Sequence, residues 1–286
     1  MAATQGVKPR ILLNLALAAL VAALALLVWL KPKPAGPVEF RLSTLSATEI
    51  GRIAIEKPGQ AAIVLEKSPP GWRVAQPFRA RADGEAIRRL LETLAATSAQ
   101  RFPAADLGRF QLDRPLLQLS LDRQQFSFGA QNPLTGGVYV ATGGNVFMVA
   151  PRHLASALRL PADFASHAFL AEDEEPAGFE SADLKLSQAQ GGKWSASPAH
   201  PEWTQDDLNR WADEWRHASS LLTQPYDGTP PQAAFALHLR GGKTLSGKIL
   251  QREPELVLLR EDENLQYHFP AGVGKRLLGL GIEKIR

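Results

Sequence analysis

Two stretches decide the fold: VYVATGGNVFMVAP at residues 138–151 and VLLREDENLQYHFP at residues 257–270. They align without a gap at an offset of 119 residues, so that Pro151 matches Pro270. Each reads as two strands around a central turn, and Gly143-Gly144-Asn145 has the chemistry of a tight hairpin turn. Each stretch therefore predicts a β-hairpin, and the match between them predicts an internal duplication.

An amphipathic helix is expected before each hairpin. The apolar positions of both helices step i, i+3, i+4, i+7, which places one apolar stripe on each helix. Asp83 is a predicted N-cap for the first helix, and Thr204 with Asp207 resembles a capping box for the second. The stripes are related by an offset of 121 residues and consist of Ile87, Leu90, Leu91 and Leu94 in the first half and Leu208, Trp211, Ala212 and Trp215 in the second.

Further strands complete each half. Ile63 and Leu65, followed by Trp72, match Leu184 and Leu186, followed by Trp194. Alternating apolar residues also mark Leu117, Leu119 and Leu121 and their counterparts Phe235, Leu237 and Leu239. A short apolar helix closes each half, so that each reads β-β-α-β-β-β-β-α. The loops look too short for crossovers, which favours antiparallel sheets.

Residues 11–30 read ILLNLALAALVAALALLVWL, a run of 20 residues with Asn14 as the one polar side chain. At about 1.5 Å per residue a helix of this length spans a hydrocarbon core of roughly 30 Å, so the run predicts a transmembrane helix. The alternative is a cleaved signal peptide with a cleavage motif at Ala23-Leu24-Ala25, although the apolar run continues beyond it. Trp29 suits the membrane interface.

These observations give an expected fold class and domain plan. The class is α+β: one N-terminal transmembrane helix, then two tandem, similar repeats of mostly antiparallel sheet plus amphipathic helices.

Basic residues before and after the span are nearly balanced. Because large domains cross membranes largely regardless of charge, the expected location is a bacterial inner membrane, with a cytoplasmic N-terminus and a periplasmic soluble domain. The parts are a tail (1–10), the span (11–30), a Pro-rich linker (31–41), a first repeat (42–170), an acidic joint (171–181) and a second repeat (182–286). The segment EDEEP at residues 172–176 reads as a solvated acidic loop.

Composition excludes several classes of function. Beyond the first 30 residues the chain has 30 basic and 29 acidic residues and lacks a dense basic run, so a nucleic-acid partner is not expected. The absence of cysteine excludes disulfides, thiolate metal sites and cysteine nucleophiles. The six histidines form no H-E-x-x-H or other close metal spacing, and no G-x-S-x-G motif occurs. We therefore predict no catalytic residue, no metal site and no cofactor, while an enzyme of unidentified class stays open.

Two places remain for a partner or a ligand. The uncharged loop GAQNPLTGG at residues 129–137 lies between two predicted strands, and Gln131, Asn132 and Thr135 are its predicted contacts. Trp203, just before the cap of the second helix, is the tryptophan least committed to the core. The loop can equally be a plain connection between strands.

Several segments of the first half carry a family resemblance. These are GWRVAQPFRARAD (71–83), GRFQLDRP (108–115), FSFGAQNPLTGGVYV (126–140) and FMVAP (147–151). Together they resemble the family known as domain of unknown function 4340, over about residues 45–170 and more loosely beyond. Gln111 stands where the family pattern favours glycine. The resemblance implies a membrane-anchored envelope protein related to auxiliary proteins of gliding-motility-type ABC transporters, and it implies no catalytic residue.

Three functions are compatible with these features. The first is a non-enzymatic accessory or scaffold that is held in the lipid bilayer and binds a membrane-associated partner, such as an ABC transporter or a polymer-handling complex. The second is a glycan- or lipid-binding module that uses a groove between the repeats. The third is an unidentified envelope enzyme.

Overall fold

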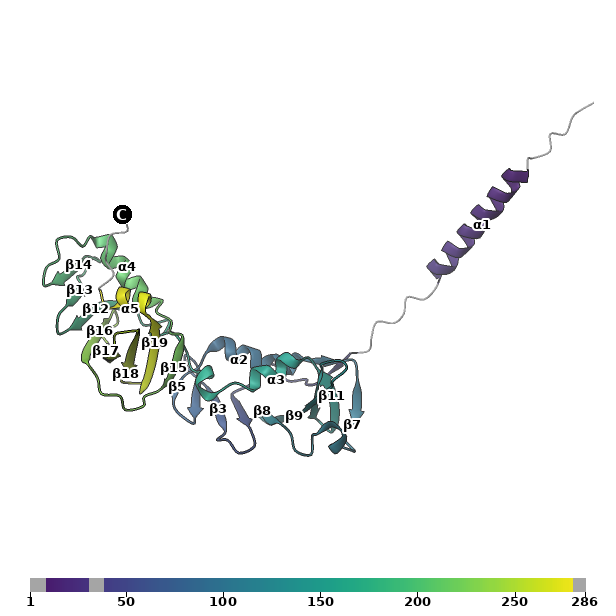
Figure 1. The fold of residues 1–286 in the computed structure, drawn as a ribbon, viewed down its shortest axis with the longest axis horizontal. Helices are drawn as coiled ribbons and strands as arrows, with labels where there is room; N and C mark the ends of the chain where they lie inside the picture. The colour runs from purple at the N-terminus through teal and green to yellow at the C-terminus, as the bar shows by residue number, and fades with distance from the viewer. Residues whose placement is uncertain (1–8, 31–38, 280–286) are drawn as a thin grey trace, which may run out of the picture. The chain divides into compact units, whose positions relative to one another are not determined.

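The computed structural model describes residues 9–30 and 39–279, and within the first stretch it places side chains continuously from Leu13 to Leu26. The chain divides into two compact units, Met1–Phe40 and Arg41–Arg286. The described element of the first unit is the 22-residue helix α1 (Pro9–Leu30) (Figure 1). Residues 1–8 of the predicted tail (1–10) and residues 31–38 of the predicted Pro-rich linker (31–41) lie outside the described residues.

The predicted transmembrane helix requires correction. Among the described residues, no helix combines the length and the apolar character needed to span a bilayer. The fold class is therefore corrected to mostly antiparallel sheet with few helices.

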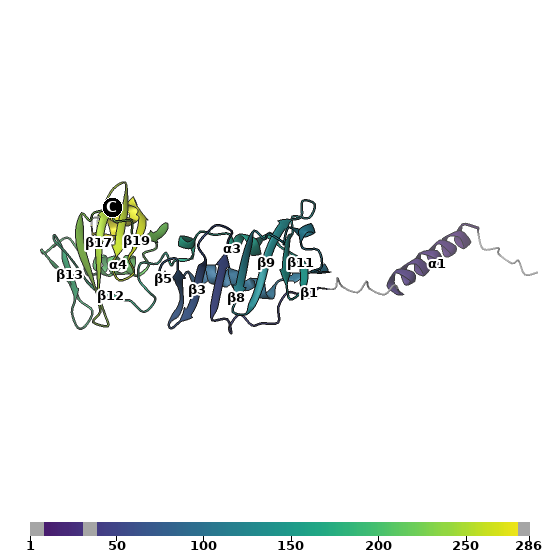
Figure 2. The ribbon, with the colours of Figure 1, turned by 90° about the horizontal axis from the view of Figure 1, so that it is seen from below.

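The second unit begins with a sheet of nine strands. Its strand order is β5-β4-β3-β2-β8-β9-β10-β11-β7, and neighbouring strands pair antiparallel. Figure 2 shows these strands in a row. The strands are β2 (Arg52–Glu56), β3 (Ile63–Ser68), β4 (Gly71–Gln76), β5 (Ala80–Arg81), β7 (Arg101–Pro103), β8 (Leu117–Leu121), β9 (Gln124–Gln131), β10 (Val138–Thr142) and β11 (Asn145–Val149). Two short strands, β1 (Phe40–Arg41) and β6 (Thr97–Ser98), form a separate two-stranded sheet.

An eight-stranded sheet follows, with the order β14-β13-β12-β16-β17-β18-β19-β15 and antiparallel pairings throughout. Its strands are β12 (Pro176–Ser181), β13 (Lys185–Gln188), β14 (Trp194–Ser197), β15 (Leu222–Pro225), β16 (Ala233–Leu239), β17 (Thr244–Gln251), β18 (Glu255–Arg260) and β19 (Leu265–Pro270).

The two sheets have the same strand order. The order β4-β3-β2-β8-β9-β10-β11-β7 in the first sheet corresponds strand by strand to β14-β13-β12-β16-β17-β18-β19-β15 in the second. Within the nine-stranded sheet as described, β5 has no counterpart in the eight-stranded sheet. The helices also occur at matching points of the chain, one after β5 or β14 and one after β11 or β19.

Helices cover one face of the first sheet. Figure 1 shows α2 (Gly84–Leu91) and α3 (Pro151–Ala157) along its strands. Asp83 caps α2 as predicted, because its carboxylate accepts hydrogen bonds from two backbone amides of the first turn. Three short 3-10 helices supplement them: η1 (Glu92–Ala95), η2 (Gly108–Phe110) and η3 (Pro161–Phe164).

The second sheet packs against α4 (Gln205–Arg216) and α5 (Ala271–Leu277). The predicted capping box of Thr204 and Asp207 is present at the start of α4. Trp211 and Trp215 are 2% and 0% exposed. Both indole N–H groups donate to the backbone carbonyl of Leu277, at 3.0 and 2.8 Å, so the two helices are joined by hydrogen bonds as well as by packing.

The predicted element order lacks some strands. β2 and β12 were not predicted, although each lies in the middle of its sheet, and the short edge strands β7 and β15 were not identified individually. The interpretation of residues 172–176 as a solvated loop is right for Glu172 and Asp173, which are exposed. It is wrong for Glu174, which is buried, and for Pro176, which is buried and begins β12.

Candidate functional site

The loop between β9 and β10 is held in shape by Asn132. Its side-chain carbonyl accepts hydrogen bonds from the backbone amides of Leu134, at 2.9 Å, and Thr135, at 3.2 Å. Its side-chain amide donates to the Tyr139 hydroxyl at 2.8 Å. Its backbone amide and carbonyl bond to Gly137 and Gly136. Asn132 therefore forms an Asx turn that closes the loop on itself.

The other two predicted contacts also bond within this region. Gln131 is the last residue of β9, and its side-chain amide donates to the Gly136 carbonyl at 2.8 Å. The Thr135 hydroxyl donates to Met148 Sδ at 3.3 Å and accepts a hydrogen bond from the Gly137 amide. The structure thus brings Gln131, Asn132 and Thr135 together, as parts of the loop's internal framework.

The exposed apolar residue of this loop is Leu134. Its relative exposure is 94%, the highest among the exposed large apolar residues of the described chain. Sequence reasoning selected the polar residues and passed over this leucine. The available signal was an apolar residue that follows proline within an otherwise polar, glycine-rich turn.

The same loop is longer than its counterpart in the second sheet. Residues 132–137 connect β9 to β10, whereas residues 252–254 connect β17 to β18. The equal strand order makes these connections equivalent. The extra residues are those that form the Asx turn and carry Leu134, so the difference between the sheets is concentrated at this loop.

Trp203 lies apart from this loop, before α4 of the second sheet. Its ring stacks on the His200 imidazole, with centroids 4.0 Å apart and planes 14° apart. The imidazole in turn contacts the Glu202 carboxylate at 2.9 Å. One face of the indole is therefore occupied by a neighbouring side chain, and the residue is half-buried.

A buried ionic network joins the two sheets. Arg81 on β5 donates to Glu263, in the turn between β18 and β19, at 2.6 Å, and to the Tyr267 hydroxyl at 3.3 Å. Arg260 donates to both carboxylate oxygens of Glu174, at 2.9 Å each. It also contacts Asp262 at 2.9 Å. The pairs Arg81–Glu263 and Arg260–Glu174 are far apart in the sequence and were not predicted from it.

Electrostatics fix the protonation of this network. Burial alone would raise the pKa of Glu174, but hydrogen bonds from Arg260, the Ala171 amide and Lys243 outweigh it and lower the pKa to about 2. Burial and the nearby Glu263 carboxylate raise the pKa of Tyr267 above its ordinary value. At neutral pH the carboxylate of Glu174 is charged and the Tyr267 phenol keeps its proton, which is the arrangement of a structural junction rather than of a general acid or base.

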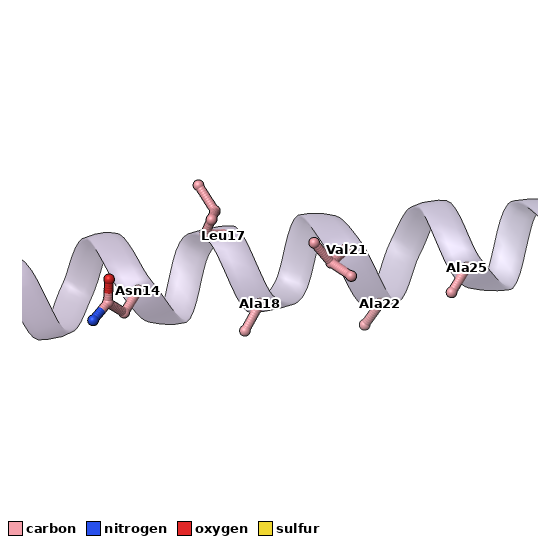
Figure 3. Close-up of a pocket in the computed structure, with 6 residues that line it drawn as sticks. All are labelled: Asn14, Leu17, Ala18, Val21, Ala22 and Ala25. Atoms are coloured by element: carbon pink, nitrogen blue, oxygen red, sulfur yellow. The ribbon is translucent and has the colours of Figure 1, made fainter.

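A shallow groove runs along α1. Figure 3 shows its six lining residues, with Ala18, Ala22 and Ala25 on successive turns of the helix. All six belong to α1, and Asn14 is the one polar side chain among them. The groove therefore offers helix surface without a converging set of reactive groups. In the part of the chain that the structure describes, no group of histidine, aspartate and glutamate is arranged to hold a metal ion.

Comparison with known proteins gives one match. A family model described as a domain of unknown function (DUF4340) matches residues 72–224. No curated protein and no solved structure matches the chain. The match extends from β4 of the first sheet to β15 of the second and thus includes the loop of Leu134 and the joint with Glu174. It covers more than half of the 286 residues, and the chain belongs to the DUF4340 family.

Proposed function

We propose that this chain is a non-enzymatic accessory protein that binds a protein partner through the loop of residues 132–137. The observation that carries this proposal is the 94% exposure of Leu134 at the tip of a loop held by internal hydrogen bonds. A loop already ordered in the free protein loses little conformational entropy when it binds, so more of the contact energy appears as affinity.

The chemistry of the loop specifies the partner's surface. Residues 129–137 contain no charged side chain, and the polar groups of Gln131, Asn132 and Thr135 are engaged within the region. The complementary surface is an apolar pocket that accepts a leucine side chain. Because charge contributes little to such a contact, we expect binding to change little with salt concentration.

The resemblance noted in the sequence supplies a first partner to test. The resemblance to domain of unknown function 4340 implies a relation to auxiliary proteins of ABC transporters, so a membrane-associated transporter subunit or polymer-handling protein is the proposed partner.

Photo-crosslinking in intact cells tests the proposal. A photoreactive amino acid replaces Leu134 in the full chain, and the adducts are identified by mass spectrometry. The matched control places the same group at Leu221, which is 73% exposed and lies in the second sheet's half of the chain. We expect one reproducible adduct from position 134 and not from position 221.

A second variant separates specific docking from general stickiness. Asn132→Ala, made in the chain that carries the photoreactive group at position 134, removes three side-chain hydrogen bonds of the loop and leaves that group in place. If the adduct depends on the loop's shape, its yield falls in this variant. Identical adducts from both positions, or a yield unchanged by Asn132→Ala, would refute the proposal.

A further inference from the structure

A polar cleft of about 210 Å³ lies in the second half of the chain, between α4 and the strands at one edge of the eight-stranded sheet. Its walls include Glu175 from the joint, Asp213 and Arg216 from α4, and Arg240 from the turn after β16. Trp194 and Asn209 also line it. Trp203 is not among its lining residues.

Two guanidinium groups share one carboxylate in this cleft. Arg240 contacts Glu175 at 2.8 Å and Arg216 contacts it at 3.4 Å. An arginine carries five N–H donors. Arg240 uses one further contact, to the Gln188 side chain at 3.4 Å. Donors therefore remain on both arginines for an additional oxyanion.

The cleft also contains an acid without a partner. Within the described residues, the side-chain carboxylate of Asp213 makes no hydrogen bond or ion pair. The hydrogen bonds of this residue with His217 are made by its backbone carbonyl. Asp213 lies one turn before Arg216 on α4, so the two side chains share a face of the helix. An unpaired carboxylate therefore lies next to guanidinium groups with spare donors.

We infer that this cleft binds a small zwitterion of the α-amino acid class. The ligand carboxylate accepts hydrogen bonds from Arg216 and Arg240, and the ligand ammonium group donates to Asp213. Paired recognition of this kind uses charge-assisted hydrogen bonds at both ends of the ligand. The site is separate from the loop of Leu134 and does not depend on the function proposed for that loop.

The charge and shape of the cleft favour a small zwitterion over a simple anion and over a sugar. Glu175 and Asp213 balance the two arginines, so a simple anion meets no excess of positive charge. A sugar would need an open aromatic face for stacking, but Trp194 is only 3% exposed. The small volume also favours a compact ligand.

The Trp194 indole provides a direct readout. Its N–H donates to the Asn209 side chain at 3.0 Å at the wall of the cleft. In a ¹⁵N–¹H spectrum of the full chain, Trp194→Phe identifies this indole signal. We expect glycine to move the signal in a saturable way, whereas methylamine and acetate, each carrying half of the ligand's charge, move it much less at equal concentration.

Variants of exposed side chains complete the test. Asp213→Asn and Arg240→Gln should each weaken glycine binding by about tenfold or more, the loss of one charge-assisted hydrogen bond. Asp206→Asn, on an exposed turn of the same helix and outside the cleft, is the matched control and should bind as the parent does. An indole signal unmoved by glycine overturns the inference. So does an equal response to acetate alone, which would indicate an anion site, or equal binding by all three variants.

Discussion

Arg260 and Glu174 lie 86 residues apart in the chain and meet through two parallel N–H to carboxylate hydrogen bonds of 2.9 Å. Their side chains are 3% and 8% exposed. A buried pair of this kind is costly to break, because removal of Arg260 leaves the Glu174 carboxylate buried with only Lys243 and the Ala171 amide among its described partners.

We expect Arg260→Met to lower the free energy of unfolding by about 3–5 kcal/mol for this reason. Urea denaturation at neutral pH measures the loss. Arg210→Met is the control, because Arg210 is exposed and 3.7 Å from Asp207, and should change stability by less than about 0.5 kcal/mol. Equal small losses in both variants would show that Arg260 is not a required partner.

The same pair predicts a dependence of stability on pH. Because the folded protein lowers the pKa of Glu174 from 4.5 to about 2, the charged form is bound more favourably by the native state. This stabilisation is fully present above pH 4.5 and is lost as the pH falls towards 2, and it amounts to about 3 kcal/mol. Urea midpoints measured across this acid range should fall more steeply for the parent than for Glu174→Gln. Parallel curves would contradict the assignment.

Two buried threonines provide a matched test of hydrogen bonding. Thr93 and Thr223 are both 0% exposed. Within the described chain the Thr93 hydroxyl has no hydrogen-bond partner, whereas the Thr223 hydroxyl bonds to Ser220 at 2.8 Å. Thr93→Val should leave stability unchanged or raise it by up to about 1 kcal/mol, and Thr223→Val should lower it by about 1–3 kcal/mol. Thermal unfolding of both variants checks the contrast, and a larger loss at Thr93 would reverse it.

Gln111 occupies a left-handed conformation, with φ 54° and ψ 39°, at the end of η2. Glycine, which the family pattern favours here, adopts this conformation freely. The strain on other residues is about 1–2 kcal/mol, and glycine loses about 0.5–1 kcal/mol through its freer unfolded chain. Gln111→Gly should therefore raise the free energy of unfolding by about 0.5–1 kcal/mol.

Gln125→Gly is the control for this change, since Gln125 is an exposed residue within β9. It should lose about 0.5–1 kcal/mol, as expected for glycine within a strand. Chemical denaturation of the two variants should give changes of opposite sign. Destabilisation of both would mean that the left-handed turn carries little strain.

Trp211 and Trp203 should respond differently to truncation. Trp211 is 2% exposed, contacts other aromatic rings and donates to the Leu277 carbonyl. We expect Trp211→Ala to lower stability by about 3–5 kcal/mol and Trp203→Ala to lower it much less, because Trp203 stacks on His200 near the surface. Denaturant unfolding of both proteins measures the difference, and equal small losses would exclude the predicted core stripe.

Local sequence patterns predicted the elements whose apolar residues recur at helical or strand spacing. The buried stripes of Leu208, Trp211 and Trp215 and of Ile87 and Leu90 follow directly from helical spacing. The hairpin of β10 and β11 follows from its alternation and its Gly143-Gly144 turn. In each case the pattern that predicts the element lies within a short segment of the sequence, so it can be recognised without knowledge of the tertiary structure.

The remainder depends on contacts that local periodicity does not record. Ile53, Ala54 and Ile55 of β2 are all buried, so this strand lacks the alternation of a half-exposed strand. The apolar run at residues 11–30 predicted a membrane span from its length and composition, and among the described residues no helix qualifies as one.

At the candidate site, sequence identified a polar loop but not the use of its polar groups. Whether Asn132 contacts a partner or its own backbone depends on the loop conformation, and the structure shows that its side chain bonds to Leu134, Thr135 and Tyr139. The pairing of Glu174 with Arg260 likewise has no local signature across 86 residues.

The strand without a counterpart in the second sheet, β5, carries Arg81, whose guanidinium group reaches Glu263 and the carbonyls of Ala168 and Phe169. The two sheets are therefore joined by these hydrogen bonds, and separating the sheets would leave Arg81 and Glu263 without each other as partners. Opening one sheet exposes the charges of this connection and removes support from the other. This coupling favours a single cooperative unfolding transition over two successive ones, even though the chain contains two complete sheets.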